Sequence, residues 1–565
     1  MIRRALASLA LVLAACGGEN EPVVPTPTED VDPAQLIVKA ALIHTGDGAP
    51  IENGAVAMRI GRIVYVGATA GAAAYEDEAT RIVDLGDGVL YPGFTDAHVH
   101  LVGIGMRELT LNLDAVGSIA ELVEVVETEV AKRGPGEPIV GRGWIETQWP
   151  EGRAPAAADI DPVSPDNPVI LQRSDGHATL VNSAALVAAG IDADTPDPEG
   201  GAIERDANGA PTGVLIDNAE NLVAGLVATP SPEMIERAYA VGGELYASRG
   251  WTGVHNMSVD YAHLDVMERL AASGDLPIRV YNAVDLQHID KIARDMRLGP
   301  RFGGDGRVIT RAVKVYFDGA LGSRGAALFE PYADRPETRG LVLLGDDDAD
   351  AAFAKAREAG LQVAAHAIGD RGNRLALEAM ARAFPDGGLA EERWRIEHAQ
   401  IVAPEDIPRF AELGVIASMQ PSHAIGDLFF APDRLGPTRL GGAYAWRSML
   451  DAGAVVAGGS DAPVEVGSPL IEFYAASVRK SLDGFSDENW RREERITPEE
   501  TLAIFTTGPA YAAFAEGRRG KIKEGWEADL TAFDTDLLAA PGPDILKAKA
   551  LLAVVDGRVV YAAAD

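Results

Sequence analysis

Between residues 91 and 515, short apolar runs alternate with helix-length amphipathic segments, and this alternation restricts the fold more than any other feature of the chain. One run ends at His98, and seven more lie at 252–255, 278–281, 312–317, 361–366, 395–398, 415–418 and 454–458. Strands that alternate with helices form parallel sheets, and eight such units are typical of a closed barrel. The sequence therefore predicts an α/β fold with a (β/α)8 TIM-type barrel over residues 91–515.

The first and second predicted strands are separated by a stretch that is far too long for one crossover helix. This stretch covers about residues 103–250 and contains Ser174-Asp175-Gly176-His177, followed by a Gly- and Pro-rich segment over 195–213. Connections within a compact domain are usually short, so we expect an inserted lid or subdomain directly after the first barrel strand.

The two ends of the chain carry a different pattern, that of short strands joined by tight turns. Apolar runs at 36–43, 55–60 and 63–67 are followed, near the C-terminus, by a run over 551–561 with Asp556-Gly557 at its centre. Such runs are typical of β-hairpins. We expect residues 36–90 and 516–565 to pair into one small β-sandwich domain beside the barrel.

The first sixteen residues are typical of an export signal. Two arginines precede a short apolar run that ends in Leu13-Ala14-Ala15-Cys16, and the run is too short to span a membrane. This ending resembles a bacterial lipoprotein signal, in which the cysteine is lipidated. Cys16 is the only cysteine, so no internal disulfide is possible. We expect a flexible tether over 17–35 and an exported protein, anchored through Cys16 on the periplasmic side; the alternative is an ordinary signal with a chance cysteine.

The composition is that of a globular protein with an acidic surface. Hydrophobic residues make up 47% of the chain and charged residues 24%, and the formal net charge is −35. Because a phosphate backbone would be repelled, the charge argues against non-specific nucleic-acid binding. We interpret it as a solubilising surface that does not identify a substrate.

Ionisable side chains stand at the C-terminal ends of several predicted strands. His98 and His100 are two residues apart, so they project from the same face of their strand, and paired imidazoles are good ligands for a divalent metal. A His-x-His motif alone is a weak signal. Four more such residues are Lys314, His366, His398 and Asp461. In a barrel these strand ends meet at one mouth, which predicts a metal centre there.

From Leu36 to the C-terminus, the chain resembles the amidohydrolase superfamily of metal-dependent hydrolases. The resemblance is to its amidohydrolase-3 branch, which includes N-substituted formamide deformylase-like and exoenzyme-regulatory-protein-like members. It rests on the motifs Pro92-Gly93-Phe94-Thr95-Asp96-Ala97-His98-Val99-His100, Asp175-Gly176-His177, Lys314-Val315-Tyr316-Phe317-Asp318-Gly319-Ala320-Leu321-Gly322-Ser323-Arg324, His366-Ala367-Ile368-Gly369-Asp370-Arg371, Arg395-Ile396-Glu397-His398-Ala399-Gln400, Ser418-Met419-Gln420-Pro421 and Gly459-Ser460-Asp461-Ala462-Pro463.

This resemblance implies a site with one or two divalent metal ions. His98 and His100 would hold the more buried ion, and His366 and His398 a second. Lys314 would react with carbon dioxide to form a carbamate that bridges both ions, since a free ammonium among metal ligands would be repelled. The alternative is an unmodified lysine that pairs with Asp318 or contacts substrate beside one ion. We expect zinc, although imidazole and carboxylate ligands also accept manganese, iron or nickel.

Asp461 is the predicted ligand and general base, because a carboxylate beside a metal-activated water can take its proton and pass it to the departing nitrogen. His177 in the insert is predicted to contact the substrate carbonyl, with a loop histidine as the alternative. Arg324 is expected to meet a substrate carboxylate or Asp318, and Asp370 to orient His366. Trp144 is expected to pack in the insert. The other histidines are taken as structural, namely His44, His255, His263, His288 and His423.

Together these features predict a metal-dependent hydrolase that cleaves a non-peptide, linear carbon–nitrogen bond of a small-molecule amide by metal-activated water. Two alternatives stay open. The first is a deaminase or cyclic-amide hydrolase on the same fold. The second is a periplasmic binding lipoprotein without turnover. Fold alone does not select the substrate, and the sequence carries no signal for an oligomeric state.

Overall fold

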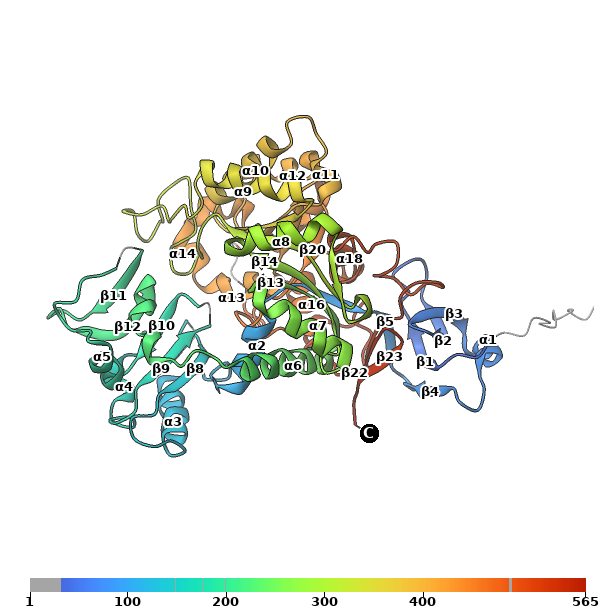
Figure 1. Ribbon diagram of the computed structural model, residues 1–565, viewed down its shortest axis with the longest axis horizontal. Helices are drawn as coiled ribbons and strands as arrows, with labels where there is room; N and C mark the ends of the chain where they lie inside the picture. Colours follow the sequence, from blue (N-terminus) through green and yellow to red (C-terminus); the bar gives the residue numbers. More distant parts are fainter. Residues whose placement is uncertain (1–31, 148, 175, 199, 487–489, 565) are drawn as a thin grey trace, which may run out of the picture.

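The computed structural model describes residues 32–147, 149–174, 176–198, 200–486 and 490–564 (Figure 1). The predicted signal over 1–16, with Cys16, and all but the end of the predicted tether lie outside the described residues. Among the described helices, none has both the length and the apolar character that crossing a membrane requires.

Eight parallel strands form the centre of the molecule and confirm the predicted barrel. They follow one another in the order of the sequence: β6 (Phe94–Val99), β13 (Trp251–Val259), β14 (Arg279–Asp285), β16 (Val308–Tyr316), β17 (Gln362–Ala367), β18 (Arg395–His398), β19 (Ile416–Met419) and β20 (Val456–Gly458). The short β15 (Arg301–Gly303) pairs antiparallel with β16. The ring closes just beyond β20, where Ala462 bridges to Val99 and the Asp461 N–H donates to the His98 carbonyl at 2.7 Å.

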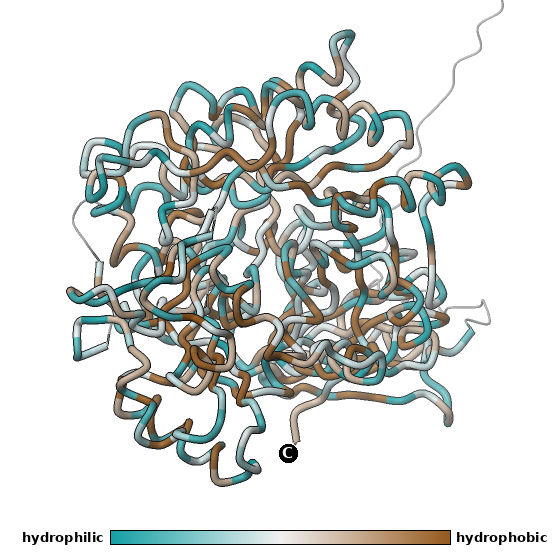
Figure 2. Tube along the Cα trace, turned by 60° about the vertical axis from the view of Figure 1, so that its left-hand side comes forward, coloured by the Kyte–Doolittle hydropathy of each residue, from teal (hydrophilic) through white to brown (hydrophobic). Residues whose placement is uncertain are grey.

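Helices surround these strands, as a parallel barrel requires. They are α2 (Leu101–Leu109), α6 (Pro232–Arg249), α7 (Leu264–Ser273), α8 (Ile289–Asp295), α9 (Asp346–Ala359), α10 (Asp370–Ala383), α11 (Leu389–Glu392), α12 (Ile407–Leu413), α13 (Pro421–Gly426), α14 (Ala431–Leu435), α15 (Trp446–Asp451), α16 (Pro469–Val478), α17 (Pro498–Ile504) and α18 (Thr507–Ala512). In α10, Ala376, Leu377 and Met380 recur at helical spacing and are buried against the core. Hydrophilic residues gather on the outer helices and loops (Figure 2).

The insert after the first barrel strand is built on its own six-stranded sheet, with the order β11-β12-β10-β9-β8-β7. Its elements are β7 (Leu111–Asn112), α3 (Ile119–Val130), β8 (Ile139–Trp144), α4 (Ala157–Ile160), β9 (Val169–Arg173), β10 (Ala178–Val181), α5 (Ser183–Ala189), β11 (Gly201–Arg205) and β12 (Pro211–Asp217). The flanking α6 belongs to the barrel instead, because its Tyr239 and Tyr246 lie in the barrel core.

The two chain ends pair with each other in one continuous sheet, with the order β23-β22-β21-β5-β1-β2-β3 and β4 beside β1. The elements are β1 (Leu36–Ile43), β2 (Ile51–Arg59), β3 (Arg62–Ala68), α1 (Thr69–Ala72), β4 (Arg81–Asp84), β5 (Val89–Pro92), β21 (Leu530–Phe533), α19 (Gly542–Ile545), β22 (Ala550–Val555) and β23 (Arg558–Ala562). The two chain ends therefore pair into one small β domain beside the barrel, and hydrogen bonds link its strands continuously. Its apolar side chains share a core, among them Val38, Val56 and Val554.

The terminal sheet runs directly into the barrel through Gly93, the residue between β5 and β6. A Cβ at this position would lie 2.4 Å from the Thr252 hydroxyl oxygen and 2.8 Å from the Asp529 Cβ, so only glycine fits. This tight junction fixes the position of β6, which ends in the His-x-His motif.

Candidate metal centre

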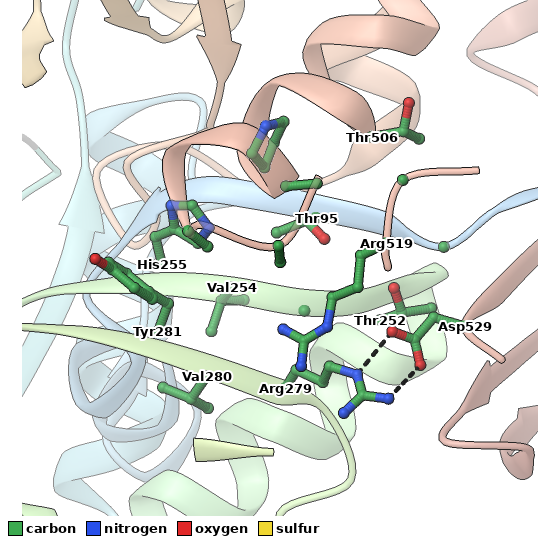
Figure 3. Close-up of a pocket in the computed structure, with 17 residues that line it drawn as sticks. Thr95, Thr252, Val254, His255, Arg279, Val280, Tyr281, Thr506, Arg519 and Asp529 are labelled. Carbon is green, nitrogen blue, oxygen red and sulfur yellow. Dashed lines mark hydrogen bonds and ion pairs between the residues drawn. The ribbon is translucent and has the colours of Figure 1, made fainter. Parts of the chain in front are cut away.

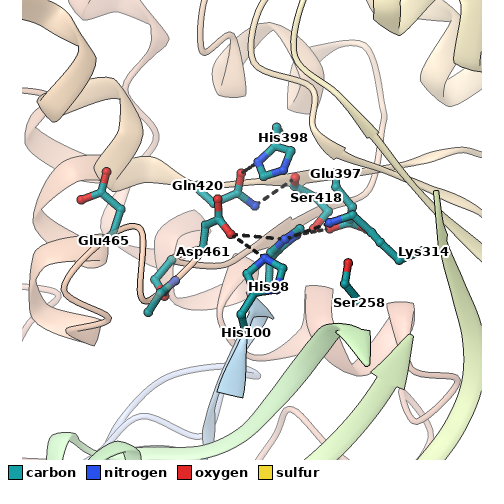
Figure 4. Close-up of polar contacts among 12 residues, drawn as sticks. His98, His100, Ser258, Lys314, Glu397, His398, Ser418, Gln420, Asp461 and Glu465 are labelled. Atoms are coloured by element: carbon teal, nitrogen blue, oxygen red, sulfur yellow. Dashed lines mark hydrogen bonds and ion pairs between the residues drawn. The ribbon is translucent and has the colours of Figure 1, made fainter. Parts of the chain in front are cut away.

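His98 lies at the C-terminal end of β6, at the mouth of the barrel (Figure 4). Its side chain is fully buried, and its Nδ1 donates to Glu397 Oε2 at 2.6 Å. This hydrogen bond fixes the tautomer and turns the Nε2 lone pair toward the centre of the mouth. Burial lowers the pKa of His98 to about 3, so the ring is neutral and its Nε2 can bind a metal.

His366 and His398 end the neighbouring strands β17 and β18, and their ring centroids lie 4.5 Å apart. His398 Nδ1 donates to Gln420 Oε1 at 2.8 Å, which again directs Nε2 inward. His366 Nε2 is buried and has no hydrogen-bond partner. Burial lowers the pKa of both rings well below the usual range for histidine. Both side chains are therefore neutral imidazoles with a nitrogen available for a ligand.

Asp461 follows β20 and brings a negative charge to these imidazoles. Its Oδ1 lies 3.4 Å from His98 Nε2 and 3.3 Å from His100 Nε2, and this oxygen is buried without a hydrogen bond. Asp461 and His398 also have positive φ angles of 62° and 74°. Such strain in residues other than glycine is concentrated at functional sites.

The donor atoms of His98, His398 and Asp461 all lie within 4.8 Å of one another. Two neutral imidazoles and one carboxylate, buried and partly without hydrogen bonds, form a donor set that suits a divalent cation. The residues therefore fit a metal ion. All six residues that the sequence predicted as ligands lie at this mouth, including His100, Lys314 and His366, while their individual roles as ligands stay predictions.

Lys314, at the end of β16, is buried directly beside these residues, with Nζ 3.3 Å from His98 Nε2. Burial lowers its pKa to about 8. The alternative of a pair with Asp318 is wrong. The Asp318 carboxylate instead accepts hydrogen bonds from the backbone N–H groups of Ala327, Ile368 and Gly369 at 2.8–2.9 Å.

A cavity of about 500 Å³ opens above the centre, between the strand ends and the insert. His177 reaches it from the insert, and its Nδ1 lies 2.8 Å from Asp217 Oδ1. Asp175, from the same sequence motif, lies outside the described residues. Trp144 is buried in the core of the insert and donates to the Leu171 carbonyl at 2.7 Å, so it packs as expected.

Two expected contacts are wrong. The Arg324 guanidinium forms an ion pair with Asp334 at 2.6 Å. It does not pair with Asp318, and Arg324 does not line the cavity. Asp370 accepts from the backbone N–H groups of Phe329 and Arg371, because it is the first residue of α10 and its carboxylate turns toward that helix start. The carboxylate near His366 is that of Asp318, at 3.6 Å.

Three residues at the site were missed from the sequence. Glu397 and Gln420 hold the metal-facing histidines, and His423, taken as structural, lies at the cavity with Nε2 3.7 Å from Asp461 Oδ2. The sequence did carry one signal for Glu397, because a charged residue inside a buried strand is unusual. Glu397 stands two residues after Arg395, and the structure shows that the two form an ion pair. His423 had no local signal, because it lies in α13, beyond the seventh strand.

A second cavity lies at the opposite end of the barrel strands, lined by Thr95, His255, Arg279 and Arg519 (Figure 3). Its volume is about 30 Å³, which leaves room for water and not for a substrate. Arg279 donates there to Asp529 at 2.7 and 2.9 Å and so ties the terminal sheet to the barrel. This cavity is structural, and the metal centre lies at the other end.

Comparison with known proteins agrees with this geometry. The sequence profile described as the amidohydrolase family matches residues 81–561. YtcJ of Bacillus subtilis is 34% identical over 86% of this chain and 92% of its own length. N-substituted formamide deformylase of Arthrobacter pascens is 28% identical over 93% of this chain and 98% of its own. The solved structure of an uncharacterized metal-dependent hydrolase from Pyrococcus horikoshii covers 90% of this chain and 99% of that one, at 26% identity and a TM-score of 0.72.

Proposed function

Because the chain belongs to the amidohydrolase family and is a metal-dependent hydrolase, we propose that it cleaves a linear, non-peptide amide bond of a small molecule. The observation that carries this proposal is the convergence of neutral, buried imidazoles and the Asp461 carboxylate at one end of a cavity. The name of the Arthrobacter pascens relative, a formamide deformylase, supports an amide as the substrate.

The described residues allow one or two ions. His98, His398 and Asp461, with His100 beside them, would hold the first, and His366 with Lys314 a second. When bound, a divalent ion such as zinc lowers the pKa of a water molecule toward neutrality and polarises a carbonyl group. Glu397 and Gln420 orient the two metal-facing imidazoles, so the donor atoms are in place before the substrate arrives.

Asp461 acts as the general base in this proposal. Its carboxylate takes a proton from the attacking water and delivers it to the amide nitrogen as the carbon–nitrogen bond breaks, which gives a carboxylic acid and an amine. His177 would contact the substrate carbonyl, since it lines the cavity and its contact with Asp217 holds the ring in place. Both residues line the same cavity, which makes a shared substrate possible.

Lys314 is proposed to be carboxylated. Its lowered pKa, about 8, keeps part of the amine neutral, and the neutral amine attacks the carbon of carbon dioxide, forms the N–C bond and releases a proton. The product is an anionic oxygen donor in place of a cation beside His98. This exchange would remove the repulsion between an ammonium and the bound ion.

We also propose that the protein is exported and anchored by a lipid on Cys16, on the evidence of residues 1–16. Replacement by Cys16→Ser should move the protein from the membrane fraction into the soluble fraction. If the full-length protein stays soluble in a bacterial host with intact lipoprotein processing, the anchor does not exist.

A metal-replete screen tests the activity with N-alkyl formamides, N-acyl amines, N-acyl amino acids and lactams. Equimolar release of amine and carboxylic acid from a linear amide is the expected result. His98→Ala and Asp461→Asn should lower kcat/KM by at least about a thousandfold, roughly 4 kcal/mol. Ammonia release from an amino-substituted ring, or ring opening without a second product, would instead reveal a deaminase or a cyclic-amide hydrolase. Full turnover in either variant would refute the mechanism.

A further inference from the structure

A side pocket adjoins the active-site cavity and has no part in the reaction described above. Its volume is about 250 Å³, and it shares four wall residues with the main cavity, namely Gly426, Glu465, Val466 and Leu482. Ile425 of α13 and Ile471 of α16 complete its apolar side. The shared residues make this pocket an extension of the substrate cavity.

The Glu465 carboxyl stands at the junction of the two spaces without a close counter-charge. Among the described residues, His423 is the one basic side chain within salt-bridge range, with Nε2 3.9 Å from Glu465 Oε1, which is too long for a hydrogen bond. Burial, together with the carboxylates of Glu472 and Asp427, raises the pKa of Glu465 well above its usual range. Glu465 therefore lies in a negative field that a cation would relieve.

His423 provides independent evidence that a polar ligand binds in this cavity. The residue is 8% exposed, and its Nε2 is buried without a hydrogen-bond partner, 3.7 Å from Asp461 Oδ2. A buried polar atom left unpaired is costly, so a partner is expected from the cavity. In Figure 4, Glu465 lies on the side of Asp461 that faces away from Lys314. A path thus leads from the reaction centre past His423 to Glu465.

Apolar side chains flank this path. Val466 and Leu482 are 38% and 53% exposed although they line a cavity, and such exposed apolar surface is typical of a binding site. Arg173, the arginine of the main cavity, is already paired with Glu146 at 2.9 and 3.2 Å. The path therefore suits an alkyl chain with a positive end, and not a substrate carboxylate.

We propose that this side pocket binds a short alkylammonium arm of the substrate through Glu465, so that the preferred substrates are monoacylated diamines. This inference rests on the proposed amide hydrolysis. Water adds to the acyl carbon, the carbon–nitrogen bond breaks, and the products are a carboxylic acid and a diamine. The charged amino group at the far end of the arm does not react.

Kinetics on a matched pair of amides test the assignment. Monoacetylated butanediamine and N-pentylacetamide have arms of the same length and differ in the terminal ammonium. The wild type should prefer the first by about tenfold in kcat/KM, about 1.4 kcal/mol. In Glu465→Gln the ratio should fall to about one. Glu358→Gln, which removes the same charge from a separate surface cavity, should keep the wild-type ratio.

Calorimetry with the metal-loaded protein separates this inference from the proposed function. Butanediamine should bind about tenfold more tightly than 1-pentanol to the wild type and equally to Glu465→Gln, whose fold is checked by its melting temperature and metal content. If amides are hydrolysed but the ratio is near one in the wild type, the pocket assignment is wrong and the hydrolase stands. If no amide is hydrolysed but butanediamine binds through Glu465, the pocket stands and the amide assignment is wrong.

Discussion

The hydrogen bond between His98 and Glu397 allows a quantitative test of how the metal centre is held. Glu397→Gln keeps the size of the side chain and removes the charge that faces His98 Nδ1 at 2.6 Å. Loss of a hydrogen-bond partner that orients a metal-binding histidine changes metal affinity by about ten- to hundredfold. We therefore expect zinc to bind Glu397→Gln about ten- to hundredfold more weakly than the wild type.

The same substitution should also destabilise the fold, because Glu397 and Arg395 are both fully buried and form an ion pair. Removal of one member of a buried pair costs about 3–5 kcal/mol. The lower part of that range applies here, since the Arg395 guanidinium also donates to the Ala97 carbonyl at 2.6 Å and to the Ser418 hydroxyl at 2.5 Å. Those bonds remain in the variant.

Two measurements separate these effects. Titration of metal-free protein with zinc against a competing chelator gives the affinity, and denaturant unfolding of the same metal-free protein gives the stability. Gln420→Leu is the matched control, because it removes the acceptor of His398 without removing a charge. It should lose affinity to a similar degree but only about 1 kcal/mol of stability. If Glu397→Gln binds zinc as tightly as the wild type, Glu397 does not position His98 for a metal.

Three further predictions concern pH, the lysine and the glycine junction. The pKa values of His98, His366 and His398 are lowered in the folded protein, so the unfolded chain binds more protons. The stability of the metal-free protein should therefore fall as pH drops below about 6.5, by up to about 1.4 kcal/mol per pH unit for each ring. Denaturant unfolding at pH 7, 6 and 5 measures this, and an unchanged free energy of unfolding contradicts it. Isotopically labelled bicarbonate should give a carbamate signal in the wild type and none in Lys314→Met, and an unlabelled wild type would leave Lys314 as a free amine. Gly93→Ala should cost about 1–3 kcal/mol in unfolding free energy, because its Cβ would overlap Thr252 and Asp529, and a wild-type melting temperature would show that the junction can relax.

The sequence predicted the barrel and the histidines of the site because both depend on local patterns. Apolar runs with helical segments between them indicate β/α units, and a histidine at the end of such a run, as in His366, points to the mouth. Contacts between distant residues could not be predicted in this way. Glu397 and His98 are 299 residues apart, and their pairing depends on how the barrel closes. For Asp370, a local pattern was misleading. Because Asp370 is close to His366 in the chain, we expected the two side chains to be in contact, but Asp370 lies at the start of α10, which prevents that contact.

The junction at Gly93 has a consequence for the growing chain on the ribosome. Strand β5 leads into the strand of His98 and His100, and one of its partners is β21, with Leu530 opposite Pro92 and Phe533 opposite Val89. The terminal sheet therefore stays incomplete until nearly the whole polypeptide has been synthesised. Asp461, whose N–H bonds to the His98 carbonyl, also emerges late. Contacts of such long sequence separation form slowly, so the nascent protein remains incompletely folded during most of translation.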